Sequence, residues 1–522
     1  MMKIFERFFS RFGGAVALSA KWVEHLRSMD LERMRAAFQV AAGSDVLPDF
    51  SALRDKAVAL GWSGVMLDKL CAYRELYGSE VSQGYQRVLV GGLAHDDFKM
   101  MLVAVARCYE FQRYVEAWQI FSDFDRRNVP AGEESEYLGQ GIALVLASRR
   151  DIVQARIFAD EAMEHGYLTM FLAMNACVVY FELGDHAKVR VLEDFMVQGF
   201  STSPYVLQSL GWLALARGYY GEGFRLLEAR QALPELRVEV PAHLWERERW
   251  TGETVKGQRL LVYEEQGIGD AVMMARYLAE LNDKGFKVLF AARQQIISLL
   301  EGCMPYVEYV VRSPRNCAAC EFDRWVPMMS LPHFMNTVVF NVPRRRGFLA
   351  APDEQRAYWR ERVGEKSARG GLRVGIAWSG NPDHKFDKRR SLAFSEVEPG
   401  IRSLPGVDFY ALQTSTPDIY PGNLYVMSEE FTTLSDTAAL IELMDIVISV
   451  DTSVVHLAGA LGKQTLLMLP YRYEWRWGLE GETNPWYESV RVLRQSRHAD
   501  WSDVLARVFE IELPKLSREG VH

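Results

Sequence analysis

Cysteine is scarce in this chain, with only six thiols among 522 residues. Sparse cysteine is typical of proteins that fold in a reducing compartment, so the composition excludes a disulfide-stapled secreted scaffold. Cys317 and Cys320 have the Cys-x-x-Cys spacing of half a zinc site, and Cys303 is the only other thiol nearby. No second such pair accompanies them, so we predict unpaired loop cysteines and no metal. A structural metal on these three thiols stays open as the alternative.

Long hydrophobic runs and an excess of basic charge are also missing. No stretch approaches the roughly 20 apolar residues that a membrane-spanning helix needs. The net charge of −8 and the pI of about 5.8 argue against a general nucleic-acid-binding protein. Residues 1–20 faintly resemble a signal peptide, but their apolar part is short and Glu6 interrupts the basic part. We therefore predict an ordinary leading helix and a cytoplasmic protein.

The length predicts two to four domains, and an internal repeat marks the first of them. Residues 143–151, 177–185 and 211–219 are similar to one another and follow at intervals of 34 residues. A helix-turn-helix period of this length, with small residues at packing positions, resembles tetratricopeptide repeats. We predict a helical region over 1–95 and a repeat array over 96–237, with an irregular helical bundle as the alternative. Such arrays form grooves that bind peptides and proteins.

After residue 255 the pattern changes to short apolar strands that alternate with helices. Repeated βα alternation predicts parallel sheets with helices on both faces. We expect two Rossmann-like domains, over 255–370 and 371–522, that face each other across a cleft. The predicted strands are 259–263, 288–291, 307–311 and 324–327 in the first domain, and 372–378, 407–413, 446–450 and 465–469 in the second.

The most informative stretch follows the apolar run 446–450. Asp451, Thr452 and Ser453 end this strand, and a small-residue helix begins directly after them. In open α/β sheets, ligands bind at the carboxyl ends of strands, where the N–H groups of the next helix favour an anion. His456 lies one turn into that helix, and its side chain can point back to the carboxyl end of the strand. The pattern predicts a site for a nucleotide diphosphate.

A second strand-turn-helix stands about 180 residues earlier, where the predicted strand 259–263 leads into a loop over 264–270. Gly267 and Gly269 would let the backbone turn tightly and approach a ligand closely. The third glycine of the dinucleotide-binding fingerprint is absent, and Asp270 puts a negative charge where a pyrophosphate would lie. We therefore interpret Asp270 as a candidate general base, with a helix N-cap as the alternative.

At this point the chain resembles a GT-B glycosyltransferase joined to tetratricopeptide repeats. Residues 267–270 are similar to the first-loop Gly-Asp of lipopolysaccharide heptosyltransferases, and 451–456 match their Asp-Thr-x-x-x-His element. Further segments resemble the repeat-containing bacterial glycosyltransferases and, more distantly, the protein O-GlcNAc transferases. These segments are 322–332, 375–382, 387–391, 435–440 and 470–477. The resemblance covers roughly 255–515 and implies an α plus α/β chain with a GT-B pair of domains.

The resemblance and the cleft position together predict the donor-binding residues. Basic side chains, hydroxyls and a helix N-terminus would stabilise the leaving phosphate without a metal or other cofactor. Asp270 and His456 are the predicted catalytic residues. The predicted donor-binding residues are Ser379, Gly380, Asn381, Lys388, Arg389, Arg390, Gln413, Asp436, Thr437, Asp451, Thr452 and Ser453. A solvated basic loop over 388–390, a core role for His456 and a helix-capping role for Asp436 stay open.

The resemblance implies an inverting, metal-independent enzyme that transfers a sugar from a nucleotide-sugar to a protein held by the repeats. Some repeat-containing enzymes of this kind glycosylate flagellin with a nonulosonic acid such as pseudaminic acid, and the size and domain order here fit that class. One alternative is a heptosyltransferase-like enzyme that acts on a lipid or polysaccharide. Another is a repeat scaffold with an inactive transferase domain. No nucleic-acid partner is expected.

Overall fold

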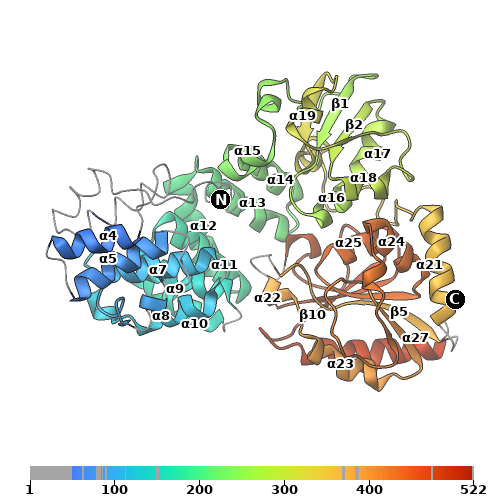
Figure 1. Cartoon of the computed structure of the whole chain (residues 1–522). Coiled ribbons are helices and arrows are strands. Elements are labelled where there is room, and N and C mark those ends of the chain that lie inside the picture. The colour runs from blue at the N-terminus through green and yellow to red at the C-terminus, as the bar shows by residue number, and fades with distance from the viewer. Residues whose placement is uncertain are drawn as a thin grey trace. The chain divides into compact units, whose positions relative to one another are not determined.

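Figure 1 shows the chain as a computed structural model, which divides into two compact units, Met1–Phe181 and Glu182–His522. The structure describes Met34 and residues 50–60, 64–77, 84, 86–88, 91–111, 113–148, 152–366, 371–382, 387–471 and 474–519. The signal-like segment 1–20 lies outside the described residues. Among the described helices, none is both long and apolar enough to cross a bilayer.

The first unit is helical where it is described. Its helices alternate apolar and polar positions at the helical period, so neighbouring helices bury their apolar stripes against each other. Gly141 allows α9 to approach Phe121 and Phe158, because a Cβ on this glycine would lie 2.8–3.0 Å from atoms of both rings. The helices are α4 (Phe50–Ala59), α5 (Gly64–Tyr77), α7 (Phe98–Glu110), α8 (Tyr114–Asp123), α9 (Glu134–Ala147), α10 (Ile152–Glu164) and α11 (Met170–Glu182).

The helical pattern continues into the second unit with α12 (His186–Phe200), α13 (Pro204–Ala216) and α14 (Tyr220–Leu227). Helices α10, α12 and α14 begin at Ile152, His186 and Tyr220, which keeps the interval of 34 residues seen in the sequence. A Cβ on Gly223 would lie 2.6 Å from the Leu215 side chain, so α13 and α14 can pack closely only with glycine there. The predicted role of small residues holds for this helix pair. The division between the units falls inside the predicted repeat array, so the last helices share a unit with the sheets.

A four-stranded parallel sheet follows the short helix α15 (Pro234–Glu239), and its strand order is β3-β2-β1-β4. Its strands are runs of β-branched, aromatic and other apolar residues, as buried parallel strands require. The elements are β1 (Arg259–Tyr263), α16 (Ile268–Met274), α17 (Arg276–Asp283), β2 (Lys287–Ala292), α18 (Gln294–Leu300), β3 (Glu308–Val311), α19 (Pro314–Ala318), β4 (Arg324–Pro327) and α20 (Leu331–Phe334).

The second sheet has six parallel strands in the order β10-β9-β8-β5-β6-β7. Helices α23 and α27 lie on one face and α24 and α25 on the other (Figure 1). Its elements are α21 (Asp353–Lys366), β5 (Leu372–Ala377), α22 (Asp387–Arg390), α23 (Phe394–Ser403), β6 (Val407–Ala411), β7 (Leu424–Tyr425), α24 (Leu434–Leu443), β8 (Ile446–Val450), α25 (Ser453–Ala460), β9 (Thr465–Leu469), β10 (Val490–Arg494), α26 (Ser502–Ala506) and α27 (Leu513–Glu519).

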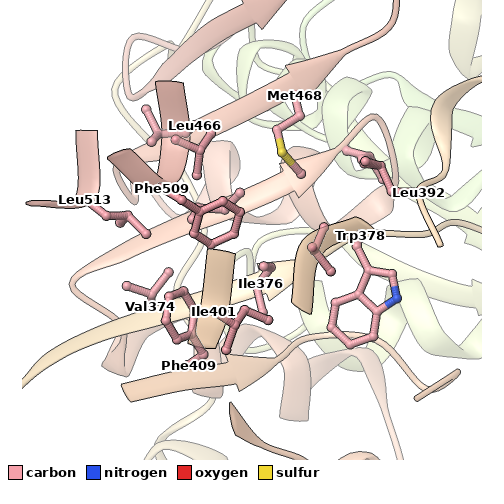
Figure 2. Packing of buried hydrophobic residues seen from close by; sticks show 14 of the residues in the cluster. Val374, Ile376, Trp378, Leu392, Ile401, Phe409, Leu466, Met468, Phe509 and Leu513 are labelled. Carbon is pink, nitrogen blue, oxygen red and sulfur yellow. The ribbon is translucent and has the colours of Figure 1, made fainter. Parts of the chain in front are cut away.

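Figure 2 shows the core that supports one face of this second sheet. Ile376 from β5 and Phe409 from β6 point toward Ile401 of α23 and Phe509, which lies between α26 and α27. All four side chains are buried. Burying an aliphatic or aromatic side chain stabilises a fold by about 1.5–3 kcal/mol, so this cluster holds the strand ends in place. Trp378, the residue after β5, packs at the edge of the same cluster.

The eight predicted strands are present, with ends shifted by at most two residues. Two further strands, β7 and β10, were not predicted, and both lie at the edges of the second sheet. The loop predicted over 264–270 is shorter than expected, because α16 begins at Ile268; α17 follows it, and the two helices meet at Ala275. The two all-parallel sheets confirm the predicted parallel-sheet α/β region.

Candidate active site

The strand order of the second sheet creates a switch point between β5 and β8. From β5 the chain proceeds to β6 and β7 on one side, whereas β8, β9 and β10 build the sheet on the other side. The two loops that leave β5 and β8 therefore turn to opposite faces of the sheet, which is the arrangement in which open α/β sheets bind ligands in a crevice at the carboxyl ends of their strands. Residues 378–382 and Asp451–Ser453 form the two sides of this crevice.

Gly380 brings the two sides of the crevice into contact. A Cβ on this residue would lie 2.7 Å from Asp387 Oδ1, 2.8 Å from Arg390 Nη2 and 3.1 Å from Thr452 Cγ2. Arg390 bridges the loops, because its Nη1 donates to the Asp451 carbonyl at 2.7 Å and its Nε donates to Asp387 Oδ1 at 3.2 Å. A guanidinium is thus fixed at the switch point, which confirms that these two predicted segments meet.

The neighbouring predicted residues take different positions. Gln413 stabilises the loop after β5 through two hydrogen bonds. Its Oε1 accepts from the backbone N–H of Trp378 at 2.8 Å, and its Nε2 donates to Ser379 Oγ at 2.7 Å. Arg389 forms an ion pair with Glu182, the first residue of the second unit, at 3.3 Å, and both side chains are almost fully buried. Asn381 is exposed.

Lys388 belongs to α22, and its side chain lies outside what the structure describes. The predicted basic cluster therefore places one guanidinium at the crevice and directs another to Glu182. This difference follows from the short helix α22, which turns successive side chains in different directions.

The opposite side of the crevice is the N-terminus of α25. Thr452 is the N-cap residue, and its hydroxyl accepts from the Val454 N–H at 3.3 Å. Ser453 is the first helical residue and is half-buried. The aligned peptide dipoles give a helix N-terminus a partial positive charge that favours an anion. Arg390 and this helix end therefore both present positive charge to the crevice.

Asp436 is a buried residue in the first turn of α24, and its hydrogen bonds are internal. Its Oδ2 accepts from the backbone and hydroxyl groups of Thr432 and Thr433, and its Oδ1 accepts from Trp359 Nε1 at 3.1 Å. Burial alone would raise the pKa of Asp436, but these donors outweigh it and hold the pKa below its usual range. The geometry is that of a helix cap. Thr437, the next residue, is half-buried.

The loop after β1 contributes the residues predicted in the first domain. Its left-handed residue is Gln266, with φ of 66°, whereas Gly267 has an ordinary φ of −79°. The tight turn predicted for the glycines is thus made by Gln266. Gly269 is required for another reason: a Cβ there would lie 2.7 Å from His456 Cδ2. The first turn of α16 therefore packs directly on α25.

Asp270 faces a guanidinium from the second domain. Its Oδ1 accepts from Arg476 Nε at 3.2 Å and from Arg476 Nη2, while its Oδ2 accepts from the Gly267 N–H at 3.2 Å. Arg476 also forms an ion pair with Glu474. Burial lowers the pKa of Arg476, but the charges of Asp270 and Glu474 outweigh it and hold the pKa above its usual range. Burial raises the pKa of Glu474.

The sequence analysis did not identify Arg476 as a site residue. It lies in the short turn Trp475–Trp477, within the segment 470–477 that was cited only for its family resemblance. Trp477 Nε1 donates to Asp451 Oδ1 at 2.9 Å, so this turn also fixes the first residue after β8. Trp475 packs on the helical region, with ring centroids 5.7 Å from Trp212 and 5.8 Å from Phe224. The α13–α14 pair thus supports the turn that carries Arg476.

His456 is almost completely buried beneath the crevice, with 5% of its surface exposed. Burial, the largest influence, lowers its pKa from 6.5 to about 4, and the positive charges of Arg476 and Arg276 act in the same direction. The carboxylates of Asp451 and Asp270 oppose this shift without cancelling it. His456 is therefore a neutral imidazole at physiological pH, which suits a hydrogen-bonding role better than that of a charged group.

We expect this lowered pKa to make stability depend on pH. Between pH 6.5 and about 4 the unfolded chain protonates His456 and the folded chain does not, so stability falls as the pH falls. The expected slope is about 1.4 kcal/mol per pH unit at most. Urea unfolding at pH 5 and pH 7.5 should show a smaller difference in His456→Gln than in the parent chain. Equal differences in the two proteins would contradict the neutral buried state.

Together these residues form a charged centre in which Asp270 pairs with Arg476, while Arg390 lies at the switch point. Asp270 supplies a carboxylate from the first domain, Arg390 and Arg476 supply guanidinium groups from the second, and α25 supplies a helix N-terminus. A carboxylate opposite an anion-binding crevice can accept a proton from a nucleophile while the crevice stabilises a departing phosphate. Among the described residues, no group of three or more His, Cys, Asp or Glu side chains is arranged to hold a metal ion.

Comparison with known proteins connects this centre to a family. Residues 431–501 match the family model of glycosyltransferase family 9 (heptosyltransferase). The chain is 27% identical over 416 residues to the protein FlbA of Caulobacter vibrioides, an alignment that covers 72% of this chain and 67% of FlbA.

Solved glycosyltransferase structures are also similar to part of the chain. The glycosyl transferase family 9 structure from Veillonella parvula aligns with a TM-score of 0.34 and 11% identity, over 50% of this chain and 92% of that one. Escherichia coli ADP-heptose lps heptosyltransferase II aligns with a TM-score of 0.34 and 13% identity, over 50% and 99% of the two chains. The family match spans Asp451–Ser453, His456 and Arg476, so these residues of the candidate centre lie inside the matched region.

Proposed function

We propose that this protein is an inverting glycosyltransferase that moves a sugar from a nucleotide-sugar to a protein acceptor. The observation that carries the proposal is the meeting of Arg390, Gly380 and Thr452 at the switch point between β5 and β8. This arrangement suits the phosphate group of a nucleotide-sugar. The family 9 match over 431–501 supports a glycosyl donor rather than another nucleotide.

In the proposed reaction, an acceptor hydroxyl attacks the anomeric carbon of the donor sugar. The new bond is between the acceptor oxygen and that carbon, and the bond to the phosphate oxygen breaks. Asp270 takes the hydroxyl proton, and the nucleotide leaves with the bonding electron pair. Attack from the face opposite the leaving group inverts the anomeric centre.

The negative charge that develops on the phosphate would be stabilised by Arg390, Arg476 and the N-terminus of α25. Preorganised charges of this kind are often the largest contribution to catalysis. In this proposal these positive groups stabilise the leaving phosphate, as a bound metal ion does in other transferases. Full donor turnover in the presence of EDTA is therefore expected.

The helical region supports a protein acceptor. The interval of 34 residues between helix starts is that of tetratricopeptide repeats, which bind peptides. The α13–α14 pair packs against the turn that carries Arg476, so the end of the helical region lies beside the proposed centre. Flagellin, modified with a nonulosonic acid such as pseudaminic acid, is the acceptor that we propose to test first.

An acceptor assay tests this proposal. The parent chain and variants with charge reversals on exposed positions of α10 and α12 would be expressed with flagellin in cells that lack the enzyme. Intact-protein mass spectrometry should show added sugar with the parent chain, and a loss of at least about tenfold in the variants, whose isolated donor hydrolysis should stay unchanged. Sugar transfer to lipid or polysaccharide alone would favour the heptosyltransferase-like alternative. Neither transfer nor hydrolysis would favour an inactive scaffold.

A further inference from the structure

His456 has one hydrogen-bond partner among the described residues, and it is a buried tyrosine. Its Nδ1 lies 3.1 Å from the hydroxyl oxygen of Tyr487, in the segment before β10. The Nε2 edge of the ring faces the first-domain loop, since Nε2 lies 3.4 Å from the position of a Cβ on Gly269. The imidazole therefore has one nitrogen held by Tyr487 and the other directed at the loop that carries Asp270.

Tyr487 itself is held firmly in place. Asn484 Oδ1 accepts from the Tyr487 N–H at 2.9 Å, and Asn484 Nδ2 donates to the Tyr487 carbonyl at 3.1 Å. Gly459, one turn after His456 in α25, leaves room for the ring, because a Cβ there would lie 2.5 Å from Tyr487 Cγ. Gly459 and Asn484 together hold the Tyr487 ring against His456.

A buried cation determines which way the hydroxyl proton points. Arg276 is fully buried, and its guanidinium carbon lies 4.8 Å from the centre of the Tyr487 ring. It donates to the carbonyl groups of Met273, Pro343 and Trp486, and no carboxylate among the described residues pairs with it. An unneutralised positive charge repels the hydroxyl proton and attracts the oxygen lone pairs. The proton is therefore directed toward His456 Nδ1, which lies 3.1 Å from the hydroxyl oxygen.

We propose that Tyr487 is a positioning residue that fixes His456 in the tautomer with its proton on Nε2. A neutral imidazole that accepts at Nδ1 must carry its proton on Nε2. The ring then presents one fixed N–H donor between the loop of Asp270 and the crevice of Arg390. This inference rests on the proposed function for what that donor binds, namely an oxygen of the nucleotide-sugar. The tautomer itself is a property of the free protein.

The charged and titratable groups around His456 come from four elements. Asp451 precedes α25, Arg476 lies in the turn 475–477, Asp270 is in α16 and Arg276 begins α17. Glu474, which pairs with Arg476, belongs to the same cluster, and burial raises its pKa to about 7. Tyr487→Phe keeps all of these groups, so a change of tautomer in that variant at constant pH reports the Tyr487 contact.

The test is nitrogen NMR of the full chain with ¹⁵N-labelled histidine, without ligand, at pH 7.5. The His456 signals are assigned by their loss in His456→Gln. We expect a single Nε2–H tautomer in the parent chain and a mixture of both tautomers in Tyr487→Phe, which keeps the ring but removes the hydroxyl. Gly459→Ala, which displaces the ring, should give the same mixture. Tyr220→Phe is the matched control, since this buried tyrosine stacks on Trp486 without contacting His456.

Nucleotide affinity provides the second measurement, with ADP, GDP, UDP and CMP as probes. Tyr487→Phe should weaken the best-binding nucleotide about fivefold, as expected for one poorly oriented neutral donor. An Nδ1–H tautomer in the parent chain, or an unchanged tautomer in Tyr487→Phe, would overturn the proposal. If no nucleotide binds the parent chain while the tautomer behaves as expected, the proposed function fails and the positioning role of Tyr487 stands.

Discussion

Replacing Asp270 with asparagine should lower sugar transfer by about 10²- to 10⁴-fold and leave donor affinity nearly unchanged. A general base typically contributes this much to a rate, and it acts on the acceptor rather than on the bound nucleotide. Asparagine keeps an oxygen that can accept from the Gly267 N–H, so the cap of α16 is retained. Single-turnover kinetics together with calorimetry would measure the two quantities separately.

The control for this variant is Glu474→Gln. Both carboxylates pair with the Arg476 guanidinium, so both variants weaken the charge balance around it. Only Asp270 comes from the first domain, where it lies in the first turn of α16. Equal losses of transfer in the two variants would mean that Asp270 acts by holding Arg476, and the assignment of Asp270 as the base would be wrong.

Replacing Gly380 with alanine should weaken nucleotide binding by about 10- to 100-fold. The new methyl group would lie 2.8 Å from Arg390 Nη2 and 2.7 Å from Asp387 Oδ1, which is closer than real contacts allow. The guanidinium must then move away from the Asp451 carbonyl and the crevice. Losing one hydrogen bond to a charged group costs about 1.5–3 kcal/mol, which corresponds to the stated range.

Gly422→Ala is the matched control for this prediction. Gly422 lies in the same domain, and a Cβ there would have no neighbour within 4 Å. This variant should bind nucleotides like the parent chain. Unchanged affinity in Gly380→Ala, measured by calorimetry on a folded protein, would show that the nucleotide does not occupy the switch point of the second sheet.

The interior strands of this protein can be predicted because each one is a nearly uninterrupted apolar run. Residues 446–450 and 465–469 are buried on both faces, and their sequences contain almost no polar side chains. Strand β10 is an edge strand, and its valines and leucine are interrupted by the half-buried Arg491 and Arg494. Strand β7 has only two residues. Edge strands carry a weaker apolar signal than central strands, and for this reason both were missed.

The candidate site was only partly predictable for a different reason. Residues that follow a strand could be identified from local sequence, and Gly380, Arg390 and Thr452 do meet at one switch point. The partner of Asp270 could not be identified in this way, because Arg476 lies more than 200 residues away and no local pattern links the two. The directions of neighbouring side chains could not be predicted either. Arg389 and Arg390 are adjacent in sequence, yet Arg389 pairs with Glu182 and Arg390 lines the crevice.

Asp436 shows the limit of the family resemblance. The sequence allowed either a donor contact or a helix cap for this residue. In the structure both of its oxygens accept hydrogen bonds from nearby protein groups, namely Thr432, Thr433 and Trp359. An acidic residue three positions after a threonine at a helix start is typical of a capping box. The local sequence therefore predicts the hydrogen bonds between Asp436 and Thr433.

The most direct test of the proposed function is donor turnover by the full chain. CMP-, UDP-, GDP- and ADP-sugars would each be incubated with the parent chain, Gly380→Ala and Gly422→Ala, and the released nucleotide would be quantified. We expect the parent chain and Gly422→Ala to release nucleotide from one donor class at equal rates, and Gly380→Ala to release it at least about tenfold more slowly at subsaturating donor. Release from no donor, or equal release by all three proteins, would contradict a glycosyl donor site at the switch point between β5 and β8.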